Sequence, residues 1–317
     1  MNKKNKPLII LTGPTAVGKT ALSLRLAKAV NGEIISADSM QVYKQMDIGT
    51  AKIMPDEMQG VKHYLVDEFM PDEDFNVVKF KELALSYMEE IYAKGKIPII
   101  VGGTGFYIQA ILNDIDFTAT EEDTSYRESL QQIADEKGAD FLYEQLREVD
   151  EEATKTIHKN NVKRVIRALE YYHQTGNKIS EHNEEQRQKE SPYNFAYFVL
   201  NHNRDILYNR IEQRIDLMMA QGLLEEVTAL SHAGYSKELV SMQGLGYKEI
   251  IAYLEGECTL EEAIYILKRD TRHFAKRQLT WFKREKEVIW LDKSEFNDNE
   301  DAILEKMCDI LREKNIQ

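Results

Sequence analysis

Cysteine is scarce in this 317-residue chain, and long hydrophobic runs are missing from it. Cys258 and Cys308 are its only cysteines, and no Cys-x-x-Cys pair occurs. That argues against a disulfide framework or a zinc finger and favours a reducing compartment. The N-terminal apolar run, Leu8–Leu11, is far too short for a signal or membrane helix. We therefore expect a cytoplasmic protein that does not enter a membrane.

Positive charge is also in deficit, because the formal net charge is −13. This argues against nucleic-acid binding by the chain as a whole, but phosphate binding depends on local patches. Tyr265–Lys286 holds eight Lys and Arg against two acidic residues, a local charge of +6. Such a stretch is either a solvated helix face or a nucleic-acid surface, and charge alone leaves both open.

The first hundred residues alternate between strand and helix patterns. Short apolar runs predict strands at Leu8–Thr12, Glu33–Ile35 and Ile97–Val101, and helical spacing of apolar residues predicts helices at Ala21–Val30 and Val78–Ala93. Further strands are predicted at His63–Val66, Tyr193–Leu200 and Val288–Leu291. This alternation indicates an α/β fold, with a parallel sheet that helices flank on both faces.

The strand pattern stops between residues 114 and 192. Charged helical segments follow there, at Tyr126–Lys137, Phe141–Glu148 and Val162–Thr175. We predict an α-helical insertion domain at 114–192, within a catalytic core formed by 1–113 and 193–317. Two long helices, Arg204–Ala233 and Leu260–Glu285, are expected to complete that core.

A glycine-rich loop follows the first predicted strand and opens the first predicted helix. Its residues match the P-loop pattern G-x-x-x-x-G-K-[ST]: Gly13, Pro14, Thr15, Ala16, Val17, Gly18, Lys19 and Thr20. The glycines let successive N–H groups turn inward, and the helix N-terminus adds positive potential. Lys19 supplies a further charge, and the Thr20 hydroxyl can ligate Mg²⁺. The motif predicts a bound diphosphate or triphosphate.

The chemistry performed on that phosphate is less constrained. An ATPase or GTPase usually has an Asp at the end of a later strand, whereas Ile97–Val101 is followed by Gly-Gly-Thr-Gly. This disfavours a motor NTPase and leaves two classes, a small-molecule kinase or an enzyme with diphosphate as leaving group. Asp38 follows the second predicted strand, at the rim where such sheets bind ligands. It could ligate metal, cap a helix or act as a general base.

Further motifs resemble those of the tRNA dimethylallyltransferases, also called tRNA isopentenyltransferases. With the P-loop they are Asp38–Gln41, Met46–Lys52, Val101–Tyr107, Asn161–Glu170, Arg210–Arg214, Gly244–Lys248 and Ala275–Trp281. The resemblance runs in order from about residue 8 to residue 292. The P-loop is generic, whereas the other motifs are specific to this family. The sequence contains no cysteine/histidine zinc module, so it is similar to the bacterial form.

The resemblance implies a reaction. A dimethylallyl group moves from dimethylallyl diphosphate to the N6 amine of the adenosine on the 3′ side of the tRNA anticodon, with Mg²⁺, and diphosphate is released. It implies that Lys19, Thr20 and Arg214 stabilise the diphosphate as charge develops on it. It gives Asp38 the role of general base. The expected partners are dimethylallyl diphosphate and the anticodon stem-loop of tRNA, and we expect a monomer.

The resemblance also implies a set of tRNA contacts. These are Asp38, Ser39, Met40, Gln41, Thr104, Arg127, Asn161, Val162, Lys163, Arg164, Val165, Gln243, Gly244, Leu245, Gly246, Tyr247 and Lys248. Tyr247 could either stack on RNA or pack in the core, and Trp281 and Phe282 are predicted to pack. The cations of the basic helix either meet tRNA phosphates or pair with acidic residues of neighbouring helices; they are Lys268, Arg269, Arg272, Lys276 and Arg277.

Three other functions stay open on the sequence. A P-loop kinase of a nucleotide or small metabolite would transfer a phosphoryl group from ATP. An adenylate prenyltransferase would modify free AMP, ADP or ATP, but the basic helix and the insertion favour RNA over a mononucleotide. A non-catalytic RNA-binding protein with a relic P-loop would need none of the three intact residues Lys19, Thr20 and Asp38.

Overall fold

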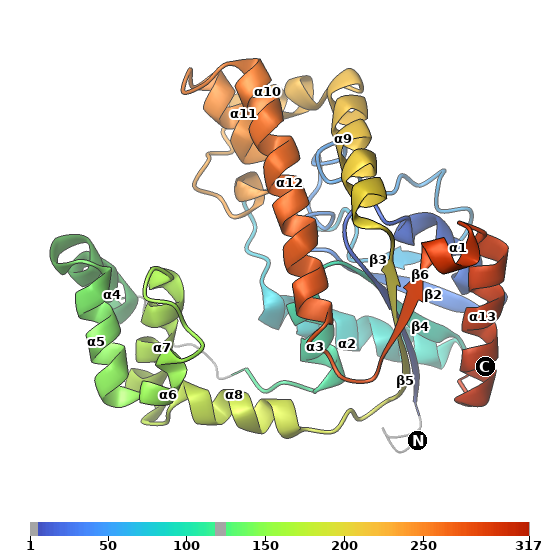
Figure 1. The fold of residues 1–317 in the computed structure, drawn as a ribbon, viewed down its shortest axis with the longest axis horizontal. Coiled ribbons are helices and arrows are strands. Elements are labelled where there is room, and N and C mark those ends of the chain that lie inside the picture. The colour runs from blue at the N-terminus through green and yellow to red at the C-terminus, as the bar shows by residue number, and fades with distance from the viewer. Residues whose placement is uncertain (1–5, 118–124, 317) are drawn as a thin grey trace. The chain divides into compact units, whose positions relative to one another are not determined.

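A computed structural model describes residues 6–117 and 125–316, which form two compact units (Figure 1). The larger unit joins Met1–Leu112 to Pro192–Gln317 and contains every strand of the sheet. The smaller unit, Asn113–Ser191, is helical where it is described. In the described ranges, no helix is both long enough and apolar enough to cross a membrane.

Six parallel strands form the sheet of the larger unit. They are β1 (Pro7–Thr12), β2 (Gly32–Ala37), β3 (His63–Tyr64), β4 (Ile97–Gly102), β5 (Asn194–Asn201) and β6 (Val288–Asp292). Their order across the sheet is β3-β2-β4-β1-β5-β6, so β1 lies between β4 and β5. Parallel neighbours need crossovers that carry helices over the faces of the sheet. The α/β fold with a P-loop core, predicted from the alternating pattern, is confirmed.

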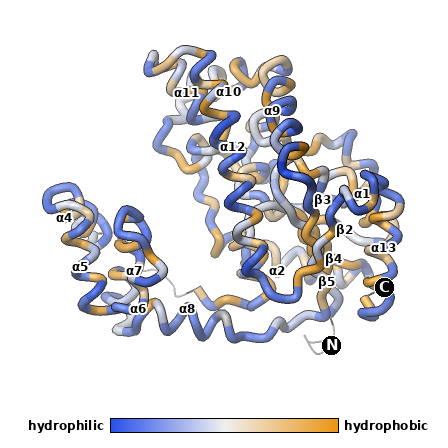
Figure 2. Tube along the Cα trace, in the orientation of Figure 1, coloured by the Kyte–Doolittle hydropathy of each residue, from blue (hydrophilic) through white to orange (hydrophobic). Residues whose placement is uncertain are grey.

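Helices cover both faces of this sheet. Side chains alternate along a strand, so Leu8 and Ile10 enter one core and Ile9 and Leu11 enter the other. The first core is covered by α2 (Val77–Ala93), α3 (Gly105–Leu112), α9 (Arg204–Ala220), α10 (Leu223–His232), α11 (Tyr247–Leu254) and α12 (Leu260–Phe282). The second is covered by α1 (Lys19–Ala29) and α13 (Glu300–Glu313). Figure 2 shows strands β4 and β5 coloured mainly as hydrophobic, as strands buried on two faces should be.

The prediction of one continuous helix over Arg204–Ala233 is wrong. The structure has two helices there, because α9 ends at Ala220 and α10 begins at Leu223. Gly222 lies at the break with a φ of 104°, a left-handed conformation that glycine adopts at little cost. The break lets α10 pack against both α9 and α11. It thereby brings the first turn of α10 beside the segment that follows β2.

The smaller unit packs around a hydrophobic core of its own. Its helices are α4 (Ser125–Lys137), α5 (Ala139–Val149), α6 (Glu151–Thr154), α7 (Val162–Thr175) and α8 (Ile179–Gln188). Leu142 and Leu146 of α5 are completely buried in this core. The buried Asp150 caps α6 and also accepts hydrogen bonds from the amide and hydroxyl of Ser180 in α8, at 2.9 and 2.6 Å. These contacts hold the helices of the unit together.

Candidate active site

The glycine-rich loop joins the end of β1 to the start of α1, at the carboxyl edge of the sheet. Gly13 has a φ of 148°, and a Cβ atom there would lie 2.4 Å from the carbonyl oxygen of Leu200 in β5. Only glycine fits such a close approach. Lys19 Nζ donates to the carbonyl oxygens of Gly13 and Pro14, both at 2.9 Å. The ammonium group therefore folds back over the curled loop, where a phosphate would need it.

The Asp38 carboxylate lies close enough to Lys19 and Arg214 to affect the ionisation of both cations. Burial lowers the pKa of Lys19 to about 8, with the Asp38 carboxylate acting against this shift and Arg214 adding to it. Burial also lowers the pKa of Arg214, and Asp38 again opposes the shift. Two cations beside one carboxylate leave an excess of positive charge. An anionic ligand would neutralise that excess.

Asp38 directly follows β2, as expected from its sequence context. Its Oδ1 accepts hydrogen bonds from the backbone N–H groups of Met40, at 2.9 Å, and Gln41, at 3.3 Å. Its Oδ2 accepts no hydrogen bond from the residues that the structure describes. One oxygen therefore fixes the turn after the strand, while the other can meet a ligand. The Asp38 carboxylate therefore caps the turn through Oδ1 and keeps Oδ2 accessible for acid–base chemistry.

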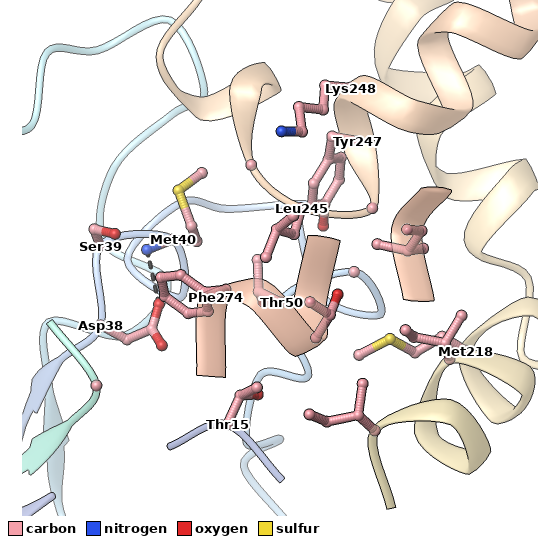
Figure 3. Close-up of a pocket in the computed structure, with 18 of the residues that line it drawn as sticks. Thr15, Asp38, Ser39, Met40, Thr50, Met218, Leu245, Tyr247, Lys248 and Phe274 are labelled. Carbon is pink, nitrogen blue, oxygen red and sulfur yellow. Dashed lines mark hydrogen bonds between the residues drawn. The ribbon is translucent and has the colours of Figure 1, made fainter. Parts of the chain in front are cut away.

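Asp38, Arg214 and Thr15 of the P-loop line a pocket of about 340 Å³ (Figure 3). Its polar lining comprises Thr15, Asp38, Ser39, Thr50, Thr104, Arg214, Gln243, Lys248, Thr271, Arg277 and Gln278. Its apolar lining comprises Met40, Ile211, Ile215, Met218, Leu245, Leu267 and Phe274. In Figure 3, Thr15 and Asp38 lie at one end, and Tyr247 and Lys248 lie at the other. A cavity with apolar walls and a few convergent polar groups is typical of a small-molecule site.

Gln278 of α12 connects the two glycine loops beside this pocket, a contact that the sequence reasoning missed. Its Oε1 accepts from the Thr15 N–H at 2.9 Å, and its Nε2 donates to the Gly103 carbonyl at 3.0 Å. A Cβ atom at Gly103 would lie 2.1 Å from that nitrogen, which explains the glycine. The only signal in the sequence is that Gln278 belongs to the family-specific stretch Ala275–Trp281.

Most predicted tRNA-binding residues of the larger unit line the pocket. They are Asp38, Ser39, Met40, Thr104, Gln243, Gly244, Leu245, Gly246, Tyr247 and Lys248. Gln41 differs, because its side-chain amide donates to the carbonyls of Thr50 and Ala51, both at 3.2 Å. The Tyr247 side chain is fully buried and donates to Glu226 at 2.7 Å. Of its two alternatives, stacking on RNA or packing, the observed one is packing.

In the smaller unit, Arg127 is committed to a bidentate ion pair. Its Nε and Nη2 donate to the two carboxylate oxygens of Glu170, at 3.1 and 2.9 Å. Arg167 donates to the same carboxylate at 2.9 Å. Burial would raise the pKa of Glu170, but the two arginines hold it below its usual value. About half of the Arg127 side chain remains exposed (49%), which leaves it accessible to a second anion.

The predicted segment Asn161–Val165 forms the start of α7. Asn161 caps the helix by accepting from the Arg164 N–H. Lys163 and Arg164 are exposed, whereas Val162 is half-buried and Val165 is fully buried in the core of this unit. The Val165 side chain therefore packs rather than facing solvent.

The cations on α12 and directly after its end fall into two groups. Three towards its start are paired with acidic residues: Lys268 with Asp216 at 2.5 Å, Arg269 with Asp270 at 2.8 Å and Arg272 with Glu212 at 2.6 Å. Those nearer its end line a second, shallower hollow with His273, Thr280 and Trp281; they are Lys276, Arg277 and Arg284. Across residues 6–117 and 125–316, none of these three cations is in a salt bridge. Pairing with acidic residues, one of the two alternatives for these cations, is therefore observed only for Lys268, Arg269 and Arg272.

The oxygen donors beside the P-loop would suit a hard cation. Thr20 is exposed at the N-terminus of α1, and Asp38 lies across the loop. Among the described residues, no cluster of three or more His, Cys, Asp or Glu side chains could hold a metal ion. Mg²⁺ commonly keeps several waters and binds through one or two protein oxygens together with substrate phosphates. The donors present fit that mode of binding.

The fold and the pocket together define a P-loop protein. The loop borders a pocket, and the carboxylate of Asp38 forms part of the pocket wall. Residues 41–285 match the family model described as IPP transferase. The chain belongs to this family of prenyl transferases, which confirms the resemblance carried by its motifs.

Named relatives match almost the whole chain. The chain is 65% identical over 311 residues to the tRNA dimethylallyltransferase of Lachnoclostridium phytofermentans, covering 98% of this chain and 99% of that protein. It is 52% identical over 296 residues to that of Acetivibrio thermocellus, covering 93% and 95%. The tRNA isopentenylpyrophosphate transferase structure from Bacillus halodurans has 43% identity, 98% coverage of both chains and a TM-score of 0.73. A eukaryotic dimethylallyltransferase acting on tRNA has 33% identity and a TM-score of 0.79, covering 90% and 74%.

Proposed function

We propose that this enzyme transfers a dimethylallyl group from dimethylallyl diphosphate to tRNA. The acceptor is the N6 amine of the adenosine on the 3′ side of the anticodon, and the by-product is diphosphate. The observation that carries the proposal is that the P-loop and Asp38 border one pocket, whose walls are largely apolar. The names of relatives at 65% and 52% identity support the same reaction.

The P-loop residues Gly13–Thr20 would hold the diphosphate, with Arg214 reaching it from α9. As the allylic C–O bond breaks, negative charge accumulates on the leaving group. Lys19, Arg214 and the loop amides stabilise that charge more in the transition state than in the bound donor, and this difference accelerates the reaction. The Thr15 hydroxyl lines the pocket beside this loop and is a candidate contact for the departing oxygen.

Asp38 would act as the general base. The N6 lone pair of adenine is delocalised into the ring, so the amine is a weak nucleophile. A carboxylate that takes its proton while the C–N bond forms lowers the barrier. The open Oδ2 of Asp38 is the atom available for that proton, because Oδ1 is held by two backbone N–H groups.

We infer that Mg²⁺ binds at the Thr20 hydroxyl together with diphosphate oxygens. A bound divalent cation would neutralise part of the charge on the diphosphate. The support is the exposed hydroxyl at the N-terminus of α1 and the hard oxygen donors around it.

The tRNA would be held in two ways. The flipped adenosine would enter the pocket between Ser39, Met40, Thr104 and the segment Gln243–Lys248, since an enzyme must unstack a base to reach its amine. Phosphates of the anticodon stem-loop would meet two sets of cations. One lies towards the end of α12 and just after it, where the described residues form no salt bridge with Lys276, Arg277 or Arg284; the other is the exposed pair Lys163 and Arg164 of the smaller unit. Arg127 and Asn161 would contribute from the same unit. We further propose that the enzyme works in the cytoplasm as a monomer, which light scattering would test.

Mass spectrometry of nucleosides tests this function directly. Unmodified tRNA is incubated with the protein, Mg²⁺ and dimethylallyl diphosphate, and N6-dimethylallyladenosine is the expected product. Parallel reactions replace tRNA with AMP, ADP or ATP, and we expect no prenylated nucleotide from them. A third reaction with γ-labelled ATP should transfer no phosphoryl group. Prenylation of AMP alone, or phosphoryl transfer, would instead assign the chain to one of the two rival enzyme classes.

A further inference from the structure

A carboxylate behind the pocket ties two of its walls together. Glu226, in the first turn of α10, accepts hydrogen bonds from three successive backbone N–H groups: Asp47 at 2.9 Å, Ile48 at 2.8 Å and Gly49 at 3.1 Å. Its Oε1 also accepts from the Tyr247 hydroxyl at 2.7 Å. Carboxylates that bind several N–H groups form short, charge-assisted bonds. The side chain of Glu226 therefore joins the turn Asp47–Gly49, which lies between β2 and β3, to the start of α11.

The turn also packs directly on the tyrosine. A Cβ atom at Gly49 would lie 2.6 Å from the Tyr247 ring, so the close contact requires glycine. Burial, and then the neighbouring Glu226 charge, raises the pKa of Tyr247 far above its usual value, so the hydroxyl stays a donor. Gly49, Thr50 and Tyr247 all line the pocket. The hydrogen-bonded contact thus lies immediately behind the surface that a ligand meets.

A second anchor fixes the same turn from its other end. The ammonium group of Lys52 is almost completely buried and donates to the Tyr43 carbonyl and the Asp47 carboxylate, both at 2.6 Å, and to the Asp67 carboxylate at 2.8 Å. Tyr43 and Asp47 lie between β2 and β3, and Asp67 follows β3, so all three partners are close to Lys52 in the chain. Glu226 is therefore the tie that comes from a distant part of the chain, and it sets where the turn lies relative to α10 and α11.

We propose that Glu226 and Tyr247 are positioning residues for the transfer reaction, which hold the wall formed by Gly49 and Thr50 at a fixed distance from Asp38. The proposal rests on the proposed function. Displacement of reacting groups by about 1 Å can cost on the order of a hundredfold in rate, so a wall that shifts would slow the chemistry. In the part of the chain that the structure describes, the proposed diphosphate site at the P-loop and Arg214 shares no hydrogen bond with this tie.

Hydrogen exchange tests the tie without any substrate. In Glu226→Gln one acceptor oxygen and the charge are lost, so the Asp47, Ile48 and Gly49 amides should exchange at least about tenfold faster. Glu225→Gln, at an exposed carboxylate in the same helical turn, is the matched control and should leave these amides unchanged. A purely global loss of stability would speed exchange in β1 and β4 equally. Unchanged exchange of the three amides in Glu226→Gln overturns the proposal.

Kinetics then tests what the tie does. We expect Glu226→Gln to lower kcat roughly ten- to hundredfold, while the KM for dimethylallyl diphosphate changes less than about threefold. Tyr247→Phe keeps the ring that packs on Gly49 and removes one hydrogen bond, so a smaller loss in kcat should result. A folded Glu226→Gln enzyme with wild-type kcat, or one whose whole defect lies in donor KM, would reject the positioning role. If the wild-type protein modifies no tRNA, the proposed function fails, while the exchange result still decides whether the tie exists.

Discussion

At the scale of single residues, burial and backbone contacts set the charges of the site. Lys19 is held against two carbonyl oxygens of its own loop, and its pKa falls to about 8 because burial disfavours the ammonium form. Asp38 is held by two N–H groups through one oxygen only. Each side chain is therefore oriented before a substrate arrives, which reduces the reorganisation that catalysis would require.

The variant Asp38→Asn distinguishes the role of Asp38 as a general base from its role as the cap of the turn. Asparagine retains an oxygen that can accept from the Met40 N–H, but it cannot take up a proton at neutral pH. We expect kcat to fall by roughly 10²- to 10⁴-fold with little change in donor binding. Steady-state kinetics on tRNA and calorimetry with dimethylallyl diphosphate would measure the two effects. A folded variant that turns over at nearly the wild-type rate would show that Asp38 only caps the turn.

Lys19 should make donor binding depend on pH. In the free protein its pKa is about 8, and a bound diphosphate would raise that pKa by favouring the ammonium form. Below about pH 8 the group is already protonated; above it, binding must take up a proton. The affinity for dimethylallyl diphosphate should therefore fall as pH rises from about 8, by up to about tenfold per pH unit.

Titration calorimetry at pH 9, in buffers of different ionisation enthalpy, measures that proton uptake. Lys19→Arg is the control, because arginine stays charged across this range and should take up no proton. Equal heats for the wild-type protein in all buffers would contradict proton uptake by Lys19 on binding.

At the scale of elements, α12 contributes to three parts of the molecule. Leu267 and Phe274 form part of the apolar wall of the pocket, Gln278 hydrogen-bonds to the two glycine loops, and Lys276 lines the second hollow. These roles fall on different faces and ends of one helix, because residues three or four apart share a face. A substitution in α12 should therefore have different consequences according to its position.

The two groups of cations, on α12 and directly after its end, provide a matched test of RNA binding. The double variant Lys276→Ala with Arg284→Ala removes cations outside any salt bridge in the described ranges. It should weaken tRNA binding and flatten the slope of log affinity against log salt by about one to two units, since roughly 0.7–0.9 counterion is released per phosphate contact. The double variant Lys268→Ala with Arg272→Ala removes cations already paired with Asp216 and Glu212, and should change the slope little. Filter binding of tRNA at several salt concentrations measures both slopes. Equal slopes in the two variants would contradict the assignment of Lys276 and Arg284 as phosphate contacts.

Helix prediction succeeded for several helices with one apolar face and missed others. α2 and α7 match their predicted ranges closely, because each buries a regular stripe. α3 is apolar nearly all round and was not predicted, since a helix buried on several sides has no amphipathic period. α11, which begins at Tyr247, was not predicted either; Gly246 and the Glu249 capping contact start the helix there. Short capped helices carry too few residues to produce a clear period.

At the scale of the whole molecule, the net charge of −13 coexists with local cationic surfaces. The acidic excess partly serves to neutralise cations within the fold, as Glu170 does for Arg127 and Arg167. Cations without such partners then stand out against an acidic background. An electrostatic background of this kind should oppose non-specific RNA binding and favour contacts at a few places.

The smaller unit should contribute to tRNA affinity and leave donor binding unaffected. Lys163→Ala with Arg164→Ala removes two exposed cations at the start of α7. We expect weaker tRNA binding and a salt slope flatter by about one to two units. Calorimetry with dimethylallyl diphosphate should show no change, because its proposed site lies in the larger unit. An unaltered slope would assign these residues to a solvated helix face.

The sequence by itself determined the P-loop, the parallel α/β sheet and the presence of Asp38 at the rim of that sheet. It could do so because each feature depends on residues adjacent in the chain: a glycine pattern, short apolar runs and a strand end. The family-specific stretches also marked the segments that line the pocket. These stretches do not show which side chains within a segment face a ligand.

Only the tertiary structure decided those orientations. Tyr247 turned inward because Glu226, from another helix, accepts its hydroxyl, and Gln278 became a clamp because the fold brings it between two glycine loops. Lys268 and Arg272 are paired with acidic residues of α9, a pairing that the sequence offered only as one of two alternatives. Each of these outcomes depends on a partner many residues away, and helix packing, rather than local spacing, brings the partners together.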